Sequence, residues 1–207
     1  MEFFRCTLAA MTIAVLACAC ADVKPKPVNP VTGQFPASKM LDADAVQTIR
    51  PFRDSYKKLV YLKVPDDKPV AFGQFYSTEL NNMHVFDKVA MKSDIEAIVI
   101  QRDLSGTVPS ISDMVGLHKL AEAIGPFLVV EPYVEWKGGY NFIAQLKAID
   151  PQTGETVLLL QQHAFNWAGL EGPMIYPLLN GFMRWTKGQE ILTKGSASST
   201  GAARAAN

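Results

Sequence analysis

The chain has 207 residues, with 20 lysines and arginines against 20 aspartates and glutamates, so its formal net charge is zero. Hydrophobic residues make up 48% of it, which excludes a disordered protein, because disorder combines low hydrophobicity with high net charge. A zero net charge also argues against a nucleic-acid partner, since phosphate recognition needs an excess of positive charge. The length predicts one folded domain with flanking segments.

An uncharged run over residues 6–21 follows Arg5 at the amino end. The run is shorter than the roughly 20 residues that a membrane-spanning helix needs. We therefore expect a secretory signal rather than a membrane span, and we exclude it from the folded domain. The run ends in Val15-Leu16-Ala17-Cys18-Ala19-Cys20, which resembles the lipobox of bacterial lipoproteins.

The resemblance implies that a signal peptidase cuts before Cys18 and that a lipid is attached to its thiol. Cys20 is the second candidate, because the residues before it fit the pattern less well. An ordinary signal peptide, cut after Ala19 or Ala21, is the alternative. In the enterobacterial sorting rule, Asp after the lipidated cysteine retains a lipoprotein in the inner membrane. Ala19 therefore implies the outer membrane, with the domain facing the periplasm.

Composition divides the rest of the chain. Prolines and lysines are frequent before residue 41, and proline favours extended, semi-rigid backbone. The last residues are mostly small and polar and cannot bury enough surface to become ordered. We expect a signal peptide over residues 1–17, a lipidated cysteine and tether over 18–40, a globular domain over 41–192, and a disordered tail over 193–207.

Hydrophobic periodicity then predicts the elements in chain order. A β-branched and aromatic run predicts a strand over 58–64, and Asp66, Asp67 and Pro69 announce a helix. Residues 84–91 are typical of a second strand. Ser93, with Glu96 three residues on, predicts a capped helix to about Asp103, although Ile98-Val99-Ile100 also suits a strand.

The second half of the chain has clearer signals. Ser112 or Asp113 caps a helix that ends at Gly125-Pro126. Three strands over 127–136, 140–149 and 155–165 are separated by turn sequences, and a helix over 175–186 follows. Pro132 cannot donate to a ladder, which implies an edge position or a bulge. The predicted fold class is α/β (α+β), a single mixed sheet with an antiparallel three-stranded meander and helices packed against it.

This order of elements resembles the α/β domain shared by the TolB N-terminal domain, the CsgG family and LpoB. Val85–Val89, Leu117–Ile124 and the hairpin Asp150–Glu155 carry the resemblance. It implies a module that binds another envelope or periplasmic protein in cell-wall synthesis or surface-structure assembly. A subunit of a CsgG-like oligomeric secretion apparatus is the alternative. The sequence departs from the family at Gly125-Pro126-Phe127, and it lacks hairpin segments long enough to build a CsgG-like pore.

Catalytic and metal-binding patterns are missing from the sequence. His84, His118 and His163 each lack a second histidine or a cysteine within four residues, so no zinc spacing occurs. Glu131 and Glu135 share a strand face but lie roughly 13 Å apart. That separation exceeds the 5–9.5 Å of a glycosidase pair. We therefore predict no catalytic residue, metal, cofactor or small-molecule substrate, and an envelope hydrolase is disfavoured.

Aromatic residues gather around an irregular segment near the carboxyl end of the domain. We predict that Phe165, Trp167 and Tyr176 form a partner-binding surface, because exposed aromatic patches often mark interaction sites. The alternative is that this segment folds over the sheet and buries these rings in the core.

Overall fold

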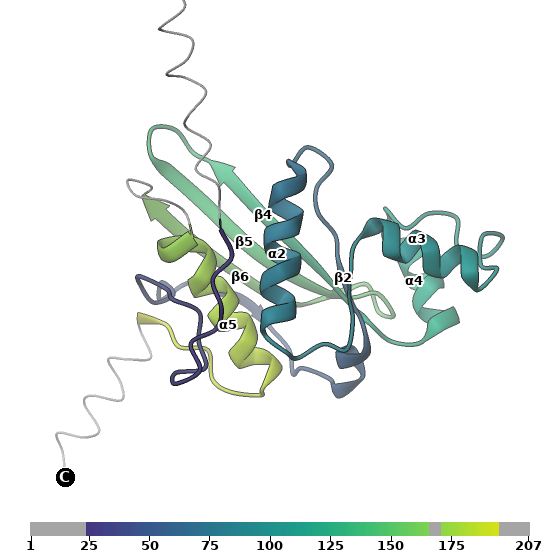
Figure 1. Cartoon of the computed structure of the whole chain (residues 1–207), viewed down its shortest axis with the longest axis horizontal. Helices are drawn as coiled ribbons and strands as arrows, with labels where there is room; N and C mark the ends of the chain where they lie inside the picture. The colour runs from purple at the N-terminus through teal and green to yellow at the C-terminus, as the bar shows by residue number, and fades with distance from the viewer. Residues whose placement is uncertain (1–23, 166–170, 195–207) are drawn as a thin grey trace, which may run out of the picture.

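The computed structural model describes residues 24–165 and 171–194 (Figure 1). Its elements, in chain order, are β1 (Val46–Ile49), a 3₁₀ turn (Asp54–Lys58), β2 (Val60–Leu62), α2 (Val70–Asn82), β3 (Val89–Ala90), α3 (Lys92–Gln101), α4 (Met114–Ile124), β4 (Leu128–Trp136), β5 (Asn141–Asp150), β6 (Glu155–Phe165), a π-helical turn (Glu171–Ile175) and α5 (Tyr176–Thr186). No described helix has the length and apolar content needed to span a bilayer.

The strands form one six-stranded sheet in the order β1-β6-β5-β4-β2-β3. Strand β2 is parallel to both of its neighbours, β3 and β4, whereas β4, β5, β6 and β1 pair antiparallel. The predicted α/β class, with one mixed sheet and an antiparallel meander, is therefore confirmed. Pro132 lies beyond the last β2–β4 pair, Leu62 with Val130, so it occupies the predicted edge position.

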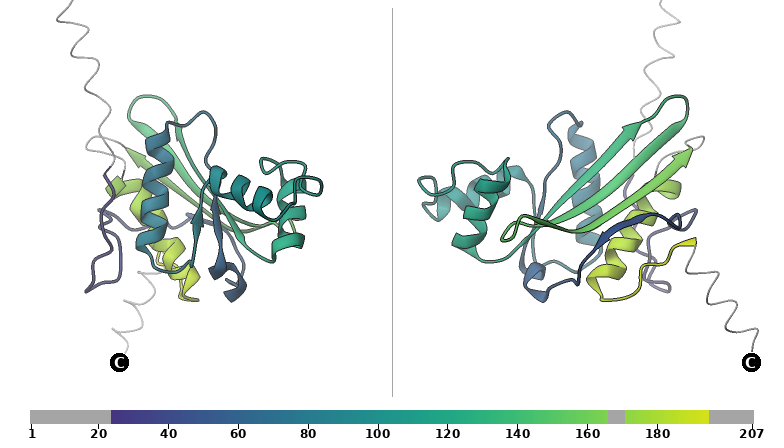
Figure 2. Two further views of the ribbon diagram at one scale, coloured as in Figure 1. Left: turned by 45° about the vertical axis from the view of Figure 1, so that its right-hand side comes forward. Right: turned by 180° about the vertical axis from the view of Figure 1, so that it is seen from behind.

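Helices cover the two faces of the sheet unequally (Figures 1 and 2). On one face α2 and α5 bury the larger core, which includes Leu62, Val130 and Leu146 from the strands. On the other face α3 and α4 pack against Tyr61 and Val129, near β2 and the start of β4. Seen from behind in Figure 2, the long strands β4, β5 and β6 carry no described helix across their middle on this second face.

The elements before β4 depart most from expectation. Only Val89–Ala90 of the strand predicted over 84–91 forms, and His84 has a positive φ of 52°. Helix α3 begins at Lys92, one residue before the predicted cap Ser93. Its first turn is held by the Asp94 carboxylate, which accepts the Met91 amide at 2.8 Å. Strand β1 and the 3₁₀ turn were not predicted, because Val46–Ile49 has only two apolar residues and lacks a continuous apolar run like the one that indicated β2.

Residues 24–40 pack against the domain, and the prediction of a tether is wrong for this part of the chain. Phe35 is buried, its ring stacks on Tyr176 at 5.5 Å, and its amide donates to Asn180 Oδ1 at 2.7 Å. The Lys26 amide donates to Glu79 Oε1 at 2.8 Å. The segment turns back on itself between Asn29 and Gln34, which pair, and the contacts of Lys26 and Phe35 fix it to the domain. At the other end, Thr193 pairs with Leu41.

Candidate functional site

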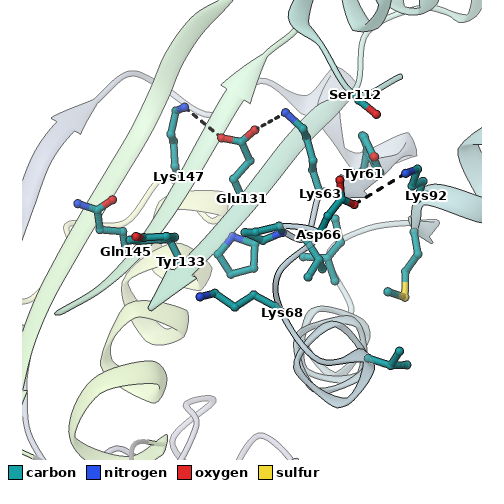
Figure 3. A pocket seen from close by; sticks show the side chains of 16 residues that line it. Tyr61, Lys63, Asp66, Lys68, Lys92, Ser112, Glu131, Tyr133, Gln145 and Lys147 are labelled. Carbon is teal, nitrogen blue, oxygen red and sulfur yellow. Dashed lines mark hydrogen bonds and ion pairs between the residues drawn. The ribbon is translucent and has the colours of Figure 1, made fainter. Parts of the chain in front are cut away.

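A cavity of about 770 Å³ opens at the carboxyl ends of β2 and β3. Its polar lining comes from Lys63 and Asp66 after β2, Lys68 before α2, Lys92 at the start of α3, and Glu131 and Lys147 on the uncovered face of β4 and β5 (Figure 3). Pro65, Val70, Pro132 and Tyr133 supply apolar walls. We call this cavity the lysine pocket, after Lys63, Lys68, Lys92 and Lys147.

Glu131 is clamped between two lysines. Its Oε1 accepts from Lys63 Nζ at 2.9 Å and its Oε2 from Lys147 Nζ at 3.0 Å. Burial is the largest influence on this carboxyl and raises its pKa, but the two lysines together outweigh burial and lower the pKa below its ordinary value. Glu131 therefore stays ionised at neutral pH and holds the two ammonium groups in place. The sequence predicted a solvated carboxylate here, but the side chain is partly buried.

The other two lysines have weak partners. Lys92 Nζ lies 3.8 Å from Asp66, whose side chain is 91% exposed. Lys68 Nζ lies 3.1 Å from the exposed Asp67 and 5.4 Å from the centre of the Tyr133 ring. Ion pairs this exposed contribute little to stability. Both ammonium groups can therefore exchange these partners for a ligand at small cost.

A second feature is a set of three exposed aromatic residues at one end of the sheet, which we call the aromatic tip: Trp136, Tyr140 and Phe165. Their exposed fractions are 64%, 53% and 59%. Trp136 and Phe165 end β4 and β6 and pair with the neighbouring Phe142 and Asn141 of β5, and the Tyr140 and Phe165 rings lie 5.6 Å apart. The Trp136 indole also donates to the Gly139 carbonyl at 2.8 Å, which holds the ring against the hairpin turn.

The structure places the three aromatic residues that were predicted to bind a partner differently. Phe165 lies in the aromatic tip. Trp167 lies outside the described residues. The prediction for Tyr176 is wrong, since it is fully buried between Phe35 and Phe75 and its hydroxyl donates to Glu79 Oε1 at 2.9 Å. It begins α5 on the face that packs against α2, so its ring belongs to the core.

Sequence reasoning missed the four lysines of the pocket. The signal was present in part, because Lys63 follows directly after β2 and Lys92 lies two residues after β3, the two strands of the parallel pair. The sequence does not show that β2 pairs with β3, and only that pairing brings the two strand ends together. Among the described residues, no group of three or more histidines, cysteines and carboxylates could hold a metal ion. His118 instead contacts the Pro151 carbonyl and Glu122.

The fold and these two surfaces define an α/β domain with a half-covered mixed sheet, a basic pocket and an exposed aromatic tip. No protein-family model and no curated protein matches the chain. Similar solved structures include the PelC dodecamer from Paraburkholderia phytofirmans, at 10% identity and TM-score 0.39, which covers 70% of this chain and 96% of that one.

Two further similar structures are the LpoB C-terminal domain from Escherichia coli and the lipoprotein GNA1162 from Neisseria meningitidis. The first has 13% identity and TM-score 0.35, and covers 54% of this chain and 85% of that one. The second has 15% identity and TM-score 0.33, with 53% and 81% covered. At these scores the fold class rests on the strand order and pairing described above. The resemblance to the TolB N-terminal domain and to CsgG stays a prediction.

Proposed function

We propose that this chain is a lipid-anchored protein of the bacterial outer membrane, facing the periplasm, whose domain binds another envelope protein and catalyses no reaction. The aromatic tip is the observation that carries the binding role. The domain buries most of its other large aromatic side chains, yet leaves three more than half exposed at one end of the sheet. Exposed aromatic residues gathered at one end of a sheet suit a contact with a partner, because aromatic residues dominate the energy of protein interfaces.

The anchor rests on the sequence around Cys18, and the fold adds a geometric consequence. Cys18 precedes Lys24, the first described residue, whose carbonyl oxygen lies 3.5 Å from the Tyr176 hydroxyl, by only six residues. Six extended residues span at most about 21 Å. A lipid on Cys18 therefore holds the domain close to the bilayer surface, so a partner within the same membrane or at its surface is in reach.

Replacing Cys18 with alanine should abolish anchoring. The variant should keep residues 1–17, incorporate no radiolabelled palmitate, and leave the outer-membrane fraction. Cys20→Ala is the matched control, two residues away in the same context, and should be processed and labelled like the unaltered chain. Loss of label in Cys20→Ala with normal labelling of Cys18→Ala would move the anchor to Cys20. Normal fractionation of both would reject the lipoprotein assignment.

Replacing Trp136 and Phe165 together with serine should weaken binding to the partner. Truncation of aromatic anchors commonly costs about 2 kcal/mol each, roughly 30-fold in affinity. Both side chains are mostly exposed, so the thermal midpoint should change little. The measurement is capture from detergent-solubilised envelopes, followed by affinity measurement with the partner identified. Ile100→Ser on α3, where the isoleucine is 71% exposed, is the matched control. Equal affinities for both variants would contradict the role of the tip.

A further inference from the structure

The lysine pocket lies where two neighbouring parallel strands send the chain to opposite faces of the sheet. Strand β2 leads into α2, which packs in the core with Leu62, whereas β3 leads into α3, which packs in the core with Tyr61. The two connections separate at the carboxyl ends of the strands and leave a crevice between them. Crevices at such switch points are the usual binding sites of open α/β sheets.

The crevice leads to an edge of β4 with which no described strand pairs, since Glu131, Pro132 and Tyr133 line the pocket and the strand continues beyond them. The Leu128 amide donates to the Leu59 carbonyl, and the Val130 carbonyl accepts the Lys63 amide. Alternate residues of a strand direct their backbone groups to the same side. The Pro132 carbonyl and both backbone groups of Val134 therefore face the same edge, and no described strand pairs with β4 there. Pro132 contributes no amide, so the available ladder begins at Val134.

The charge of the pocket selects the ligand. Its lining holds four lysines and two acids, an excess of two positive charges in a chain whose net charge is zero. The first turn of α2 contains no acidic residue, and Val70 at its start also lines the pocket. The positive end of this helix therefore adds to the field of the lysines. The ammonium groups come from several elements around the cavity (Figure 3), which suits several spaced carboxylates better than one compact anion.

We propose that the lysine pocket binds an extended acidic peptide segment of a partner protein. The segment pairs with β4 from Val134 onward, and its carboxylates contact Lys68 and Lys92, which release the exposed Asp67 and Asp66. An apolar side chain of the segment fits against Pro132 and Tyr133. Strand addition supplies backbone hydrogen bonds, which a free phosphate or a metal chelate cannot use, and the lysines supply selectivity for acidic sequence. The inference rests on the proposed binding role and uses the pocket and the β4 edge, which adjoins the aromatic tip at Trp136.

The test uses the full-length chain in non-ionic detergent and a fluorescein-labelled peptide of about eight residues that alternates glutamate with valine. We expect saturable binding that weakens as salt is raised, because salt screens exposed charges. A Lys68→Glu and Lys92→Glu double variant should bind at least tenfold more weakly. The matched control is Lys57→Glu with Lys119→Glu, since each of these lysines also pairs with one exposed acid. The control should keep its affinity within twofold.

Three outcomes would overturn the proposal. The first is equal loss of affinity in both double variants, which would mean that only general charge matters. The second is that a peptide with N-methylated backbone amides binds as tightly as the unmethylated peptide, and that the Val134 amide gains no protection from hydrogen exchange when the peptide is bound. The third is displacement by inorganic phosphate at the concentration of the peptide, which would make this a small-anion site. Phe165→Ser alters the tip on β6, two strands away from the β4 edge, and should bind the peptide normally. Loss of peptide binding in the lysine variant therefore leaves the tip proposal standing, and loss of partner binding in Phe165→Ser leaves the pocket proposal standing.

Discussion

Replacing Glu79 with leucine should lower the free energy of unfolding by about 3 kcal/mol, because it leaves several buried or partly buried donors without an acceptor. Glu79 is fully buried on α2 and accepts from the Lys26 amide at 2.8 Å, the Tyr176 hydroxyl at 2.9 Å and the Asn82 side chain at 3.0 Å. Burial, with the hydrogen bond to Glu79, raises the pKa of the Tyr176 hydroxyl, so that hydroxyl remains a donor.

Urea unfolding followed by tryptophan fluorescence measures the loss. Gln74→Leu is the matched control, since it places the same side chain on an exposed position of the same helix. Glu79→Gln keeps one acceptor oxygen and should lose about 1 kcal/mol. Hydrogen exchange adds a local measure, because the Lys26 and Phe35 amides should lose protection in Glu79→Leu. A change no larger than in the Gln74 variant would mean that these donors find other acceptors.

The Glu79 contacts also show why the start of the domain could not be predicted from the sequence. Residues 24–40 have the composition of a tether, and nothing in their periodicity marks Phe35 as a core residue. Its place is decided by partners far along the chain, Tyr176 and Asn180. The same long-range packing buries the Tyr176 ring, so this residue is not part of the binding surface that the sequence predicted. Composition indicates how a segment behaves in isolation. Residues 24–40 are instead ordered by their contacts with α5, which lies far along the chain.

Predictions for the sheet succeeded where alternation was long. Strands β4, β5 and β6 have nine to eleven residues each, so the period of two and the intervening turns determine their bounds nearly alone. Strands β2 and β3 have three and two residues, and their parallel pairing depends on contacts across the intervening helix. The lysine pocket lies at the ends of that pair of short strands. A polar site at the ends of parallel strands can be predicted only when the strand neighbours are known.

Replacing Gly116 with alanine should be at least as damaging as the loss of Glu79. A Cβ at this position would lie 1.5 Å from the Ser110 carbonyl oxygen and 2.5 Å from the Ser110 carbonyl carbon, which are backbone atoms that no side-chain rotation can clear. Gly116 lies in the first turn of α4, where its amide donates to the capping Asp113 carboxylate at 2.8 Å. Relief of the clash requires the loop at Ser110 to move away from the helix, and the cap is strained by that movement.

We expect Gly116→Ala to cost about 3 kcal/mol or more, which lowers the thermal midpoint of a domain of this size by roughly 10 °C. Differential scanning calorimetry measures the midpoint. Gly106→Ala is the control, because an added Cβ there meets no atom within 4 Å and the midpoint should stay within about 2 °C. Ser112, two residues after the displaced Ser110, lines the lysine pocket. Gly116→Ala should therefore also weaken binding of the acidic peptide at temperatures where the domain stays folded, whereas an unchanged midpoint would show that the loop yields without cost.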